Sequence, residues 1–215
     1  MSRKEIKKYF FSVEGETEEL YLNWLEKKIN SFERSKYNVK FDVKVEKNPK
    51  RRVKQINTLN KIDILHVIDY EEENNDPLFQ KSLTYMREAE GLKKVKYHLG
   101  YSNYTFDLWI ILHKNPYFST VSHRKNYLSV INRTYNCGYE SMDEYKEKRN
   151  FNKILEQLSL QDVINAIERA ETIERNNNQN GYRKVSYRNY SYFKNNPSLN
   201  LHEYIKKIFD EIKIY

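Results

Sequence analysis

Two kinds of hydrophobic pattern alternate along the first part of the chain. Residues 9–13 form a short aromatic and β-branched run, which is typical of a buried strand. Apolar side chains then recur at the spacing of one helix face from Leu20 to Ile29, after Thr17 as the expected N-cap. The run at residues 62–68 is the most strand-like segment of the chain. These patterns predict a helix that follows one buried strand and precedes another.

Further elements extend this alternation to about residue 100. Residues 39–45 alternate between apolar and charged side chains and predict a half-exposed strand. Asn48 and Pro49 begin a basic helical segment that we expect to reach about residue 60. A helix over residues 77–91, with its proline in the first turn, precedes a fourth strand at residues 95–99. Strands that alternate with helices predict a parallel sheet with helices on its faces.

The second half of the chain has a mostly helical pattern. A polar loop at residues 176–181 is its clearest break. The predicted fold class is α/β, with a parallel β-sheet flanked by helices and a mostly helical C-terminal part. We expect residues 1–115 to form the α/β core and residues 116–215 a helical extension packed on it. Helices are predicted at residues 106–114, 125–135, 151–158, 160–175 and 199–212.

Composition narrows the functional classes. The 215 residues include 38 Lys and Arg against 30 Asp and Glu, and this net charge of +8 favours a polyanionic partner such as nucleic acid. A single cysteine, Cys137, excludes a disulfide framework and any multi-cysteine zinc module, and it suits a reducing compartment. The apolar run before Glu14 is too short for a signal peptide, and no run reaches the ~20 residues of a membrane helix. We therefore expect a cytoplasmic protein without a membrane partner.

Acidic residues stand at the ends of two predicted strands. Glu14 ends the first strand and Glu18 lies in the first turn of the next helix, whereas Asp69 ends the strongest strand and Glu71 follows it. Ligands of open α/β sheets gather at the carboxyl ends of the strands. If these two strands are neighbours, three or four carboxylates meet in one crevice. The alternative is that acids in a first helical turn only stabilise the helix dipole.

A cluster of carboxylates generally holds a cation, because unpaired like charges are costly when they lie close together. Oxygen ligands without histidine or cysteine favour Mg²⁺, Mn²⁺ or Ca²⁺ over zinc. Mg²⁺ bound by a few carboxylates, with waters and a substrate phosphate, is a common arrangement for phosphoryl transfer.

Four ordered motifs carry a family resemblance. Residues 13–18, Val-Glu-Gly-Glu-Thr-Glu, resemble the first motif of Toprim domains, and Asp69-Tyr70-Glu71 stands where those domains carry Asp-x-Asp. Residues 102–113 are similar to the RloB-like signature Ser-Asn-Pro-Cys-Phe-Glu-Leu-Trp followed by aliphatic residues and His. Residues 166–170 and Asn196-Pro197-Ser198 also match this family. The chain therefore resembles RloB-like proteins, which are related to the OLD-family nucleases, over nearly its whole length.

The resemblance implies a Toprim-like fold and a metal-dependent nuclease that acts on RNA, with tRNA as one candidate, or on DNA. It places the protein in phage defence by abortive infection, beside a separate ATPase subunit. Glu14 would be the essential acid, either as a metal ligand or as a general base. Asp69 and Glu71 would be catalytic and hold Mg²⁺ or Mn²⁺, Glu18 would be a ligand directly or through water, and Asp107 would be a further ligand. Glu71 replaces the second Asp of Asp-x-Asp and Asp107 replaces Glu. These two departures motivate the alternative of a non-catalytic scaffold that binds nucleic acid or an ATPase.

Two basic stretches are candidates for nucleic-acid contacts. Clusters of cations supply non-specific affinity by neutralising phosphates, and aromatic residues among cations can stack bases. The alternatives are a solvated helix face for the first stretch and core or edge-strand packing for the second. The candidate residues are Lys50, Arg51, Arg52 and Lys54 in the first stretch, and Arg183, Lys184 and Arg188 in the second.

The remaining candidates are mostly expected to be structural. His113 stands at the family position at the end of an apolar helix, where capping or packing competes with a catalytic role. His66 lies inside a predicted strand, and Trp24 and Trp109 lie on apolar helix stripes. Cys137 has no partner motif, so a nucleophilic role has little support. A homo-oligomer remains open.

Overall fold

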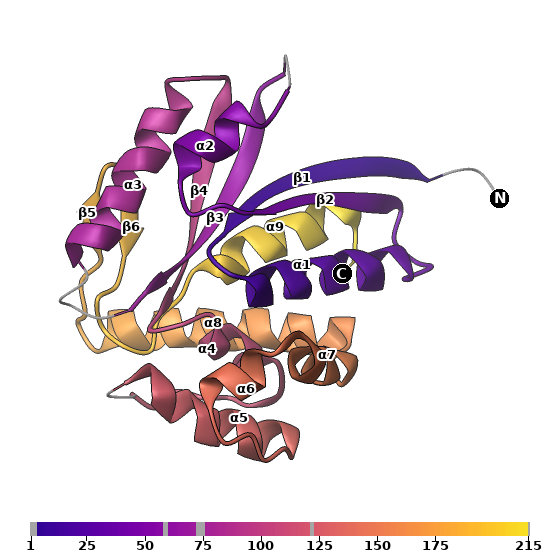
Figure 1. Cartoon of the computed structure of the whole chain (residues 1–215), viewed down its shortest axis with the longest axis vertical. Helices are drawn as coiled ribbons and strands as arrows, with labels where there is room; N and C mark the ends of the chain where they lie inside the picture. Colours follow the sequence, from indigo (N-terminus) through magenta and orange to yellow (C-terminus); the bar gives the residue numbers. More distant parts are fainter. Residues whose placement is uncertain (1–3, 58–59, 72–75, 121–122, 215) are drawn as a thin grey trace.

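Four parallel strands form the central sheet in the computed structural model, which describes residues 4–57, 60–71, 76–120 and 123–214. The strand order is β2-β1-β3-β4, so the first and third strands are direct neighbours (Figure 1). The strands are β1 (Glu5–Val13), β2 (Tyr37–Val45), β3 (Ile62–Tyr70) and β4 (Val95–Asn103). The helices α1 (Glu16–Asn30), α2 (Pro49–Lys54) and α3 (Asp76–Glu90) connect them in sequence. This architecture confirms the predicted α/β class.

Both faces of the sheet are buried, and the side chains of each strand alternate between them. In β1, Phe11 and Val13 enter one hydrophobic cluster and Phe10 enters the other. In β3, Leu65 joins the first cluster and Ile64 the second. Parallel sheets generally need such cover on both faces, because helical crossovers pack on each side.

The first face packs against α1 and against most of the helices of the second half. All side chains of α4 from Leu108 to Leu112 are fully buried there. The second half therefore shares one core with the first. The helices of the second half are α4 (Asp107–Lys114), η2 (Arg124–Asn126), α5 (Tyr127–Tyr135), α6 (Met142–Lys146), α7 (Lys148–Glu156), α8 (Leu160–Gln179) and α9 (Leu201–Ile212). Figure 1 shows α4 to α8 below the sheet, with α9 nearer to its strands.

The second face packs against α2, α3 and a small hairpin. The hairpin consists of β5 (Val185–Tyr187) and β6 (Tyr190–Tyr192), which are antiparallel. Arg188 and Asn189 form its two-residue turn with φ values of 51° and 71°. Positive φ at both positions is the geometry that matches the twist of a tight hairpin. Tyr192 anchors the hairpin because its ring is fully buried against Phe79.

Three local predictions are wrong. Gly15, and not Thr17, is the N-cap of α1, while Thr17 lies inside the first turn and donates its hydroxyl proton to Glu18 Oε2. α2 ends at Lys54 instead of near residue 60, and α8 continues to Gln179 through most of the expected polar loop. The asparagines of that segment were expected to break the helix. Tertiary packing overrides this weak propensity, since Asn177 is buried and donates to Pro197 O.

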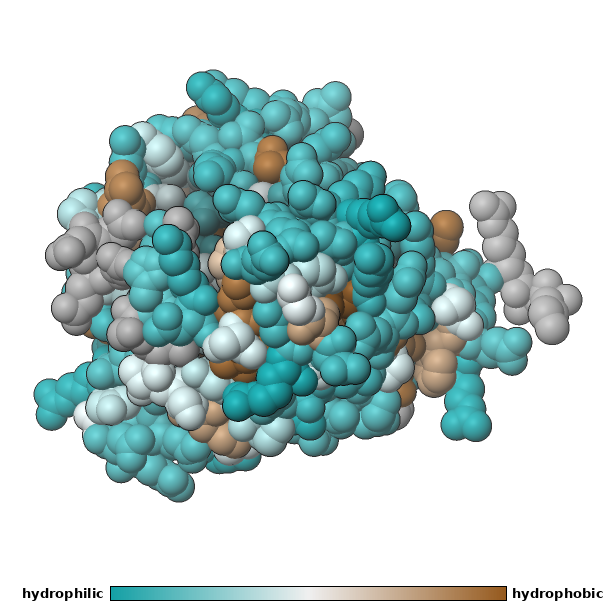
Figure 2. Space-filling view, turned by 60° about the horizontal axis from the view of Figure 1, so that its bottom comes forward, coloured by the Kyte–Doolittle hydropathy of each residue, from teal (hydrophilic) through white to brown (hydrophobic). Residues whose placement is uncertain are grey.

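The surface is hydrophilic, in agreement with the high charge content. Figure 2 shows mostly hydrophilic residues on one face, with hydrophobic residues in small separate patches. No helix within the described ranges is both long enough and apolar enough to cross a bilayer.

Candidate active site

Glu14 and Asp69 meet at the carboxyl edge of the sheet. Glu14 follows β1 directly, and its Oε2 accepts a hydrogen bond of 3.2 Å from the backbone N–H of Asp69 in β3. This contact exists because β1 and β3 pair in parallel, with Val13 opposite Val67. The condition on which the sequence analysis depended, that these two strands are neighbours, is therefore met.

Glu18 reaches the same edge from the first turn of α1. Its side chain is buried, and its Oε2 accepts a bond of 3.0 Å from Thr17 Oγ1. The glycine of the Val-Glu-Gly motif leaves room for it. A Cβ on Gly15 would lie only 3.0 Å from Glu18 Oε2, which is tighter than ordinary contacts.

Asp107 approaches from the start of α4, after a tight turn that ends β4. In that turn Tyr104 has a φ of 62° and donates its backbone N–H to Tyr70 O at 2.8 Å. Thr105 Oγ1 then donates to Asp107 Oδ2 at 2.6 Å and accepts from the Asp107 backbone N–H at 3.2 Å. The Asp107 side chain is fully buried, and Thr105 fixes its orientation.

A C-terminal segment holds the end of β4 in place. The Asn103 side-chain amide donates to Lys194 O and Asn195 O at 3.0 and 2.8 Å, and Ser198 Oγ donates to Asn103 Oδ1 at 2.9 Å. An isolated bridge pairs Ser102 with Leu199. Two of the motifs that carry the family resemblance, Ser-Asn at the end of β4 and Asn-Pro-Ser before α9, thus pack against each other behind the turn to Asp107.

The structure adds a cation that the sequence analysis missed. Lys146, the last residue of α6, places its Nζ 3.3 Å from Asp107 Oδ2. Burial alone would lower the pKa of Lys146, but the charges of Asp107, Asp69 and Glu18 outweigh it and raise this pKa. Lys146 belongs to a run of charged residues that is typical of a solvated helix face. Its place beside Asp107 depends on the tertiary packing of α6, which the sequence does not predict.

We call Glu14, Glu18, Asp69 and Asp107 the edge cluster. Burial, followed by the charges of Glu18 and Glu14, raises the pKa of Asp69 well above its usual range. Burial also raises the pKa values of Glu18 and Glu14. Shifts of this kind mean that the ionised cluster is poorly compensated by the protein itself.

Two oxygens of the edge cluster suit a metal ion. Asp69 Oδ1 and Asp107 Oδ1 are buried and have no hydrogen-bond partner. Buried polar atoms generally have partners, and an unsatisfied pair of carboxylate oxygens is a natural ligand set for a hard cation such as Mg²⁺. Within the described part of the chain, however, no three of these carboxylates bring oxygens within 4.8 Å of one another. Lys146 supplies the positive charge beside them.

Glu71 lies beside the edge cluster and faces a neighbouring cavity. This cavity of about 210 Å³ is lined by Glu71, Glu14, Asp69 and Lys47, among others. The charge of Glu71 contributes to the raised pKa of Glu14. The structure therefore brings Glu71 near Glu14, and its expected role as a ligand stays a prediction.

Arg52 requires a correction among the expected nucleic-acid contacts. Its guanidinium is buried, donates to Phe11 O at 3.1 Å and pairs with Asp42 Oδ1 at 2.7 Å, so it ties α2 to the sheet and does not face solvent. Lys50 pairs with Glu88 at 2.7 Å. The other candidates lie on the surface, and of these Lys184 pairs with Glu174 at 2.5 Å. These surface residues are Arg51, Lys54, Arg183, Lys184 and Arg188.

His113 is a core residue. It is fully buried, its Nδ1 lies 2.8 Å from Trp109 O, and its Nε2 lies 3.1 Å from the Tyr21 hydroxyl. Burial lowers the pKa of His113 to about 4, so the imidazole is neutral. This arrangement supports the packing alternative over a catalytic role.

The other side chains that were expected to be structural are also found in the core or against it. His66 is buried in β3, with its Nδ1 2.6 Å from Ser12 Oγ. Trp109 is fully buried, and Trp24 is partly buried against the same cluster. Burial raises the pKa of the Cys137 thiol, which does not favour a nucleophile.

Comparison with known proteins agrees with the motifs. The pattern of the family described as "RloB-like protein" matches residues 9–208. Searches of curated proteins and of solved structures give no match. The matched region includes every member of the edge cluster, Lys146 and the segment that holds the end of β4. The chain therefore belongs to the RloB-like protein family.

Proposed function

We propose that this protein is a Mg²⁺-dependent nuclease that hydrolyses phosphodiester bonds in RNA, with tRNA as one candidate, or in DNA. The observation that carries the proposal is the edge cluster. Its carboxylates come from separate elements, and two of them present buried oxygens without a partner. An acidic side chain that only stabilised a helix dipole would have its oxygens hydrogen-bonded or in contact with solvent.

Glu14, Glu18, Asp69 and Asp107 would hold the metal, with Glu71 at its margin. Mg²⁺, or Mn²⁺ in its place, supplies charge stabilisation at phosphate and a more acidic bound water when it is present. Glu14 would serve either as a metal ligand or as the general base that accepts a proton from the attacking water. Thr105 keeps Asp107 in one orientation.

The basic surface supports a nucleic-acid substrate. Arg51, Lys54, Arg183 and Arg188 are exposed, and cations of this kind provide the salt-dependent part of nucleic-acid affinity. Family membership supports a role in phage defence, in the cytoplasm and beside an ATPase subunit, as part of the same proposal.

A non-catalytic scaffold is the second candidate, and Lys146 is the observation that favours it. An ammonium group 3.3 Å from Asp107 supplies the positive charge that a metal would otherwise provide. In that case the protein would bind nucleic acid or an ATPase without cleaving the nucleic acid.

Cleavage of labelled tRNA, single-stranded DNA and duplex DNA with Mg²⁺ or Mn²⁺ tests the proposal. We expect Glu14→Gln to lower the cleavage rate by about 10²–10⁴-fold, the usual contribution of a general acid or base. Glu16→Gln is the matched control, because Glu16 is an exposed glutamate only two residues from Glu14, in the first turn of α1. Equal cleavage by wild type and Glu14→Gln would remove Glu14 from the mechanism, and no cleavage by wild type would favour the scaffold.

A further inference from the structure

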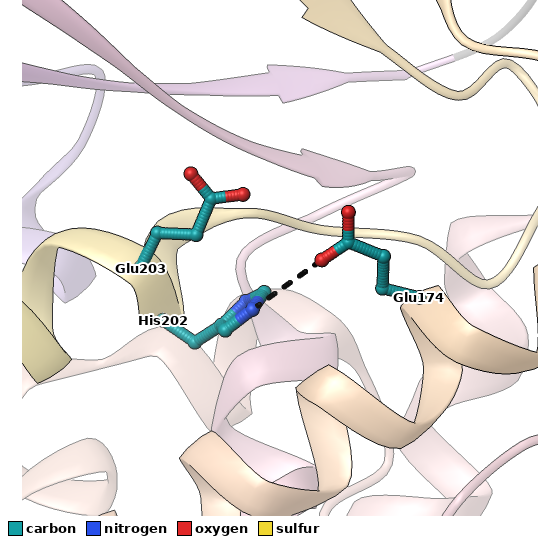
Figure 3. Close-up of side chains that lie close together, drawn as sticks. All are labelled: Glu174, His202 and Glu203. Carbon is teal, nitrogen blue, oxygen red and sulfur yellow. Dashed lines mark ion pairs between the residues drawn. The ribbon is translucent and has the colours of Figure 1, made fainter.

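A second group of potential metal ligands lies between α8 and α9. Glu174 projects from the C-terminal part of α8, and His202 and Glu203 project from the first turn of α9. Figure 3 shows the three side chains close together at the junction of the two helices, with His202 and Glu174 facing each other. We call them the α8–α9 cluster. It shares no residue with the edge cluster.

The three side chains are close enough to share one ion. Each offers a ligand atom, and these atoms all lie within 4.8 Å of one another. The separation between His202 Nε2 and Glu174 Oε2 is 3.9 Å, which is too long for a hydrogen bond. The imidazole nitrogen and the carboxylate oxygen are therefore close to each other but do not form a hydrogen bond.

His202 is the observation that points to a ligand. Its residue surface is only 2% exposed, and its Nδ1 is buried without a hydrogen-bond partner. Its Nε2 faces Glu174 without a hydrogen bond. A buried imidazole whose nitrogens lack hydrogen bonds is uncommon, since buried polar groups generally have a hydrogen-bond partner. Burial lowers the pKa of His202 to about 4, so a nitrogen electron pair is free at neutral pH.

Glu174 is held in an orientation that suits this imidazole. Its Oε1 pairs with Lys184 at 2.5 Å, whereas its Oε2 is the oxygen that faces His202. Lys184 thus fixes the carboxylate and leaves one oxygen toward the cluster. Partners outside the ligand set commonly orient metal-binding side chains in this way.

Glu203 completes the set from the solvent side. It is exposed and lines a cavity of about 470 Å³ together with Lys184, so water molecules have room to complete a coordination shell.

We propose that Glu174, His202 and Glu203 bind a divalent transition-metal ion of the zinc class. One imidazole nitrogen with two carboxylates is a mixed ligand set that zinc accepts in tetrahedral sites with water. Magnesium prefers oxygen ligands alone, so the imidazole separates this site in chemistry from the edge cluster. The ion would link α8 to the start of α9, directly after the segment that holds the end of β4.

Calorimetric titration of the full chain with Zn²⁺, in excess Mg²⁺ to occupy the edge cluster, tests this site. Glu203→Gln is the decisive variant, because Glu203 is exposed and its substitution leaves the core intact. We expect its Zn²⁺ affinity to fall at least about tenfold, since even partners outside the ligand set change metal affinity by 10–100-fold. Glu168→Gln is the control, because Glu168 is an exposed residue of α8 outside the cluster, and its affinity should equal that of wild type.

The imidazole gives a second readout that does not depend on activity. Zn²⁺ should move the ¹⁵N resonance of one His202 ring nitrogen in wild type, and Glu14→Gln should retain this shift because it alters only the edge cluster. Equal Zn²⁺ affinity in wild type and Glu203→Gln, or unmoved His202 nitrogens at saturating Zn²⁺, would overturn the proposal.

Discussion

The edge cluster and the α8–α9 cluster both place acidic side chains beside a lysine, but they differ in burial and in donor atoms. The edge cluster offers only carboxylate oxygens, and Asp107 is fully buried against Lys146. The α8–α9 cluster includes an imidazole, and its carboxylates reach the surface. The buried cluster is therefore the more strongly perturbed one, because low polarity strengthens every unpaired charge.

This difference shows why acidic residues in sequence are a poor guide to a site by themselves. The carboxylates of the edge cluster converge because parallel strands end at one edge of the sheet. The carboxylates of the α8–α9 cluster lie close together because two helices pack against each other. No local sequence motif predicts this packing.

The largest expected effect is on cleavage. Asp107→Asn keeps the shape of the side chain but removes its charge, so it should lower the cleavage rate by about 10²-fold or more. Asp210→Asn is the control, because Asp210 is an exposed residue of α9. Initial rates on the best substrate measure both. Full activity of Asp107→Asn would exclude Asp107 from the reaction.

The two lysines should differ in their contribution to the free energy of unfolding. Lys146→Met leaves buried carboxylates without a counter-ion and should cost about 1–3 kcal/mol, less than a fully buried pair because Lys146 is partly exposed. Lys184→Met breaks a surface pair and should change stability by less than about 1 kcal/mol. Urea denaturation without metal measures both, and Mg²⁺ should restore part of the loss in Lys146→Met. Equal losses would show that burial does not distinguish the clusters.

The edge cluster should also make stability depend on pH. The pKa of Asp69 is raised in the folded protein, so the folded state binds more protons than the unfolded state above about pH 4. Stability should therefore fall as pH rises from the unfolded pKa through the raised one. Asp69→Asn should flatten this fall in metal-free denaturation curves measured from pH 4 to 8. If Asp69→Asn left the slope of stability against pH unchanged, Asp69 would not be the group responsible for the fall.

The smallest effect is expected at the hairpin next to the α8–α9 cluster. Arg183→Ala and Arg188→Ala remove exposed cations, so each should weaken nucleic-acid binding a few-fold and reduce the salt slope by about 1. Fluorescence anisotropy at several salt concentrations measures both quantities. An unchanged salt slope in both variants would remove the hairpin from the binding surface.

The strand ends could be predicted because their pattern is local. The buried runs before Glu14 and before Asp69 predict two strands from the sequence alone. That these strands are neighbours is known only from the strand order in the structure. The turn that places Asp107 was visible only as a family motif. Its tight geometry at Tyr104 depends on a hydrogen bond from the Tyr104 backbone N–H to Tyr70 O in β3.

The remaining features depend on contacts between distant segments. Lys146 reads as part of a solvated charge run until α6 packs near Asp107. Arg52 reads as one of several surface cations, yet its position on α2 turns it toward the sheet and Asp42. His202 and Glu174 lie on different helices, so their proximity has no signature in either segment. In each case the direction of a side chain, and not its type, decides its role.

Calorimetric titration with Mn²⁺ tests whether the edge cluster binds a metal ion. The titration uses chains that carry Glu203→Gln, so that the α8–α9 cluster contributes little heat. We predict saturable Mn²⁺ binding in this background and its loss when Asp69→Asn is added, because Asp69 Oδ1 is a buried oxygen without another partner. Absence of binding at millimolar Mn²⁺, or equal binding with and without Asp69→Asn, would contradict this prediction.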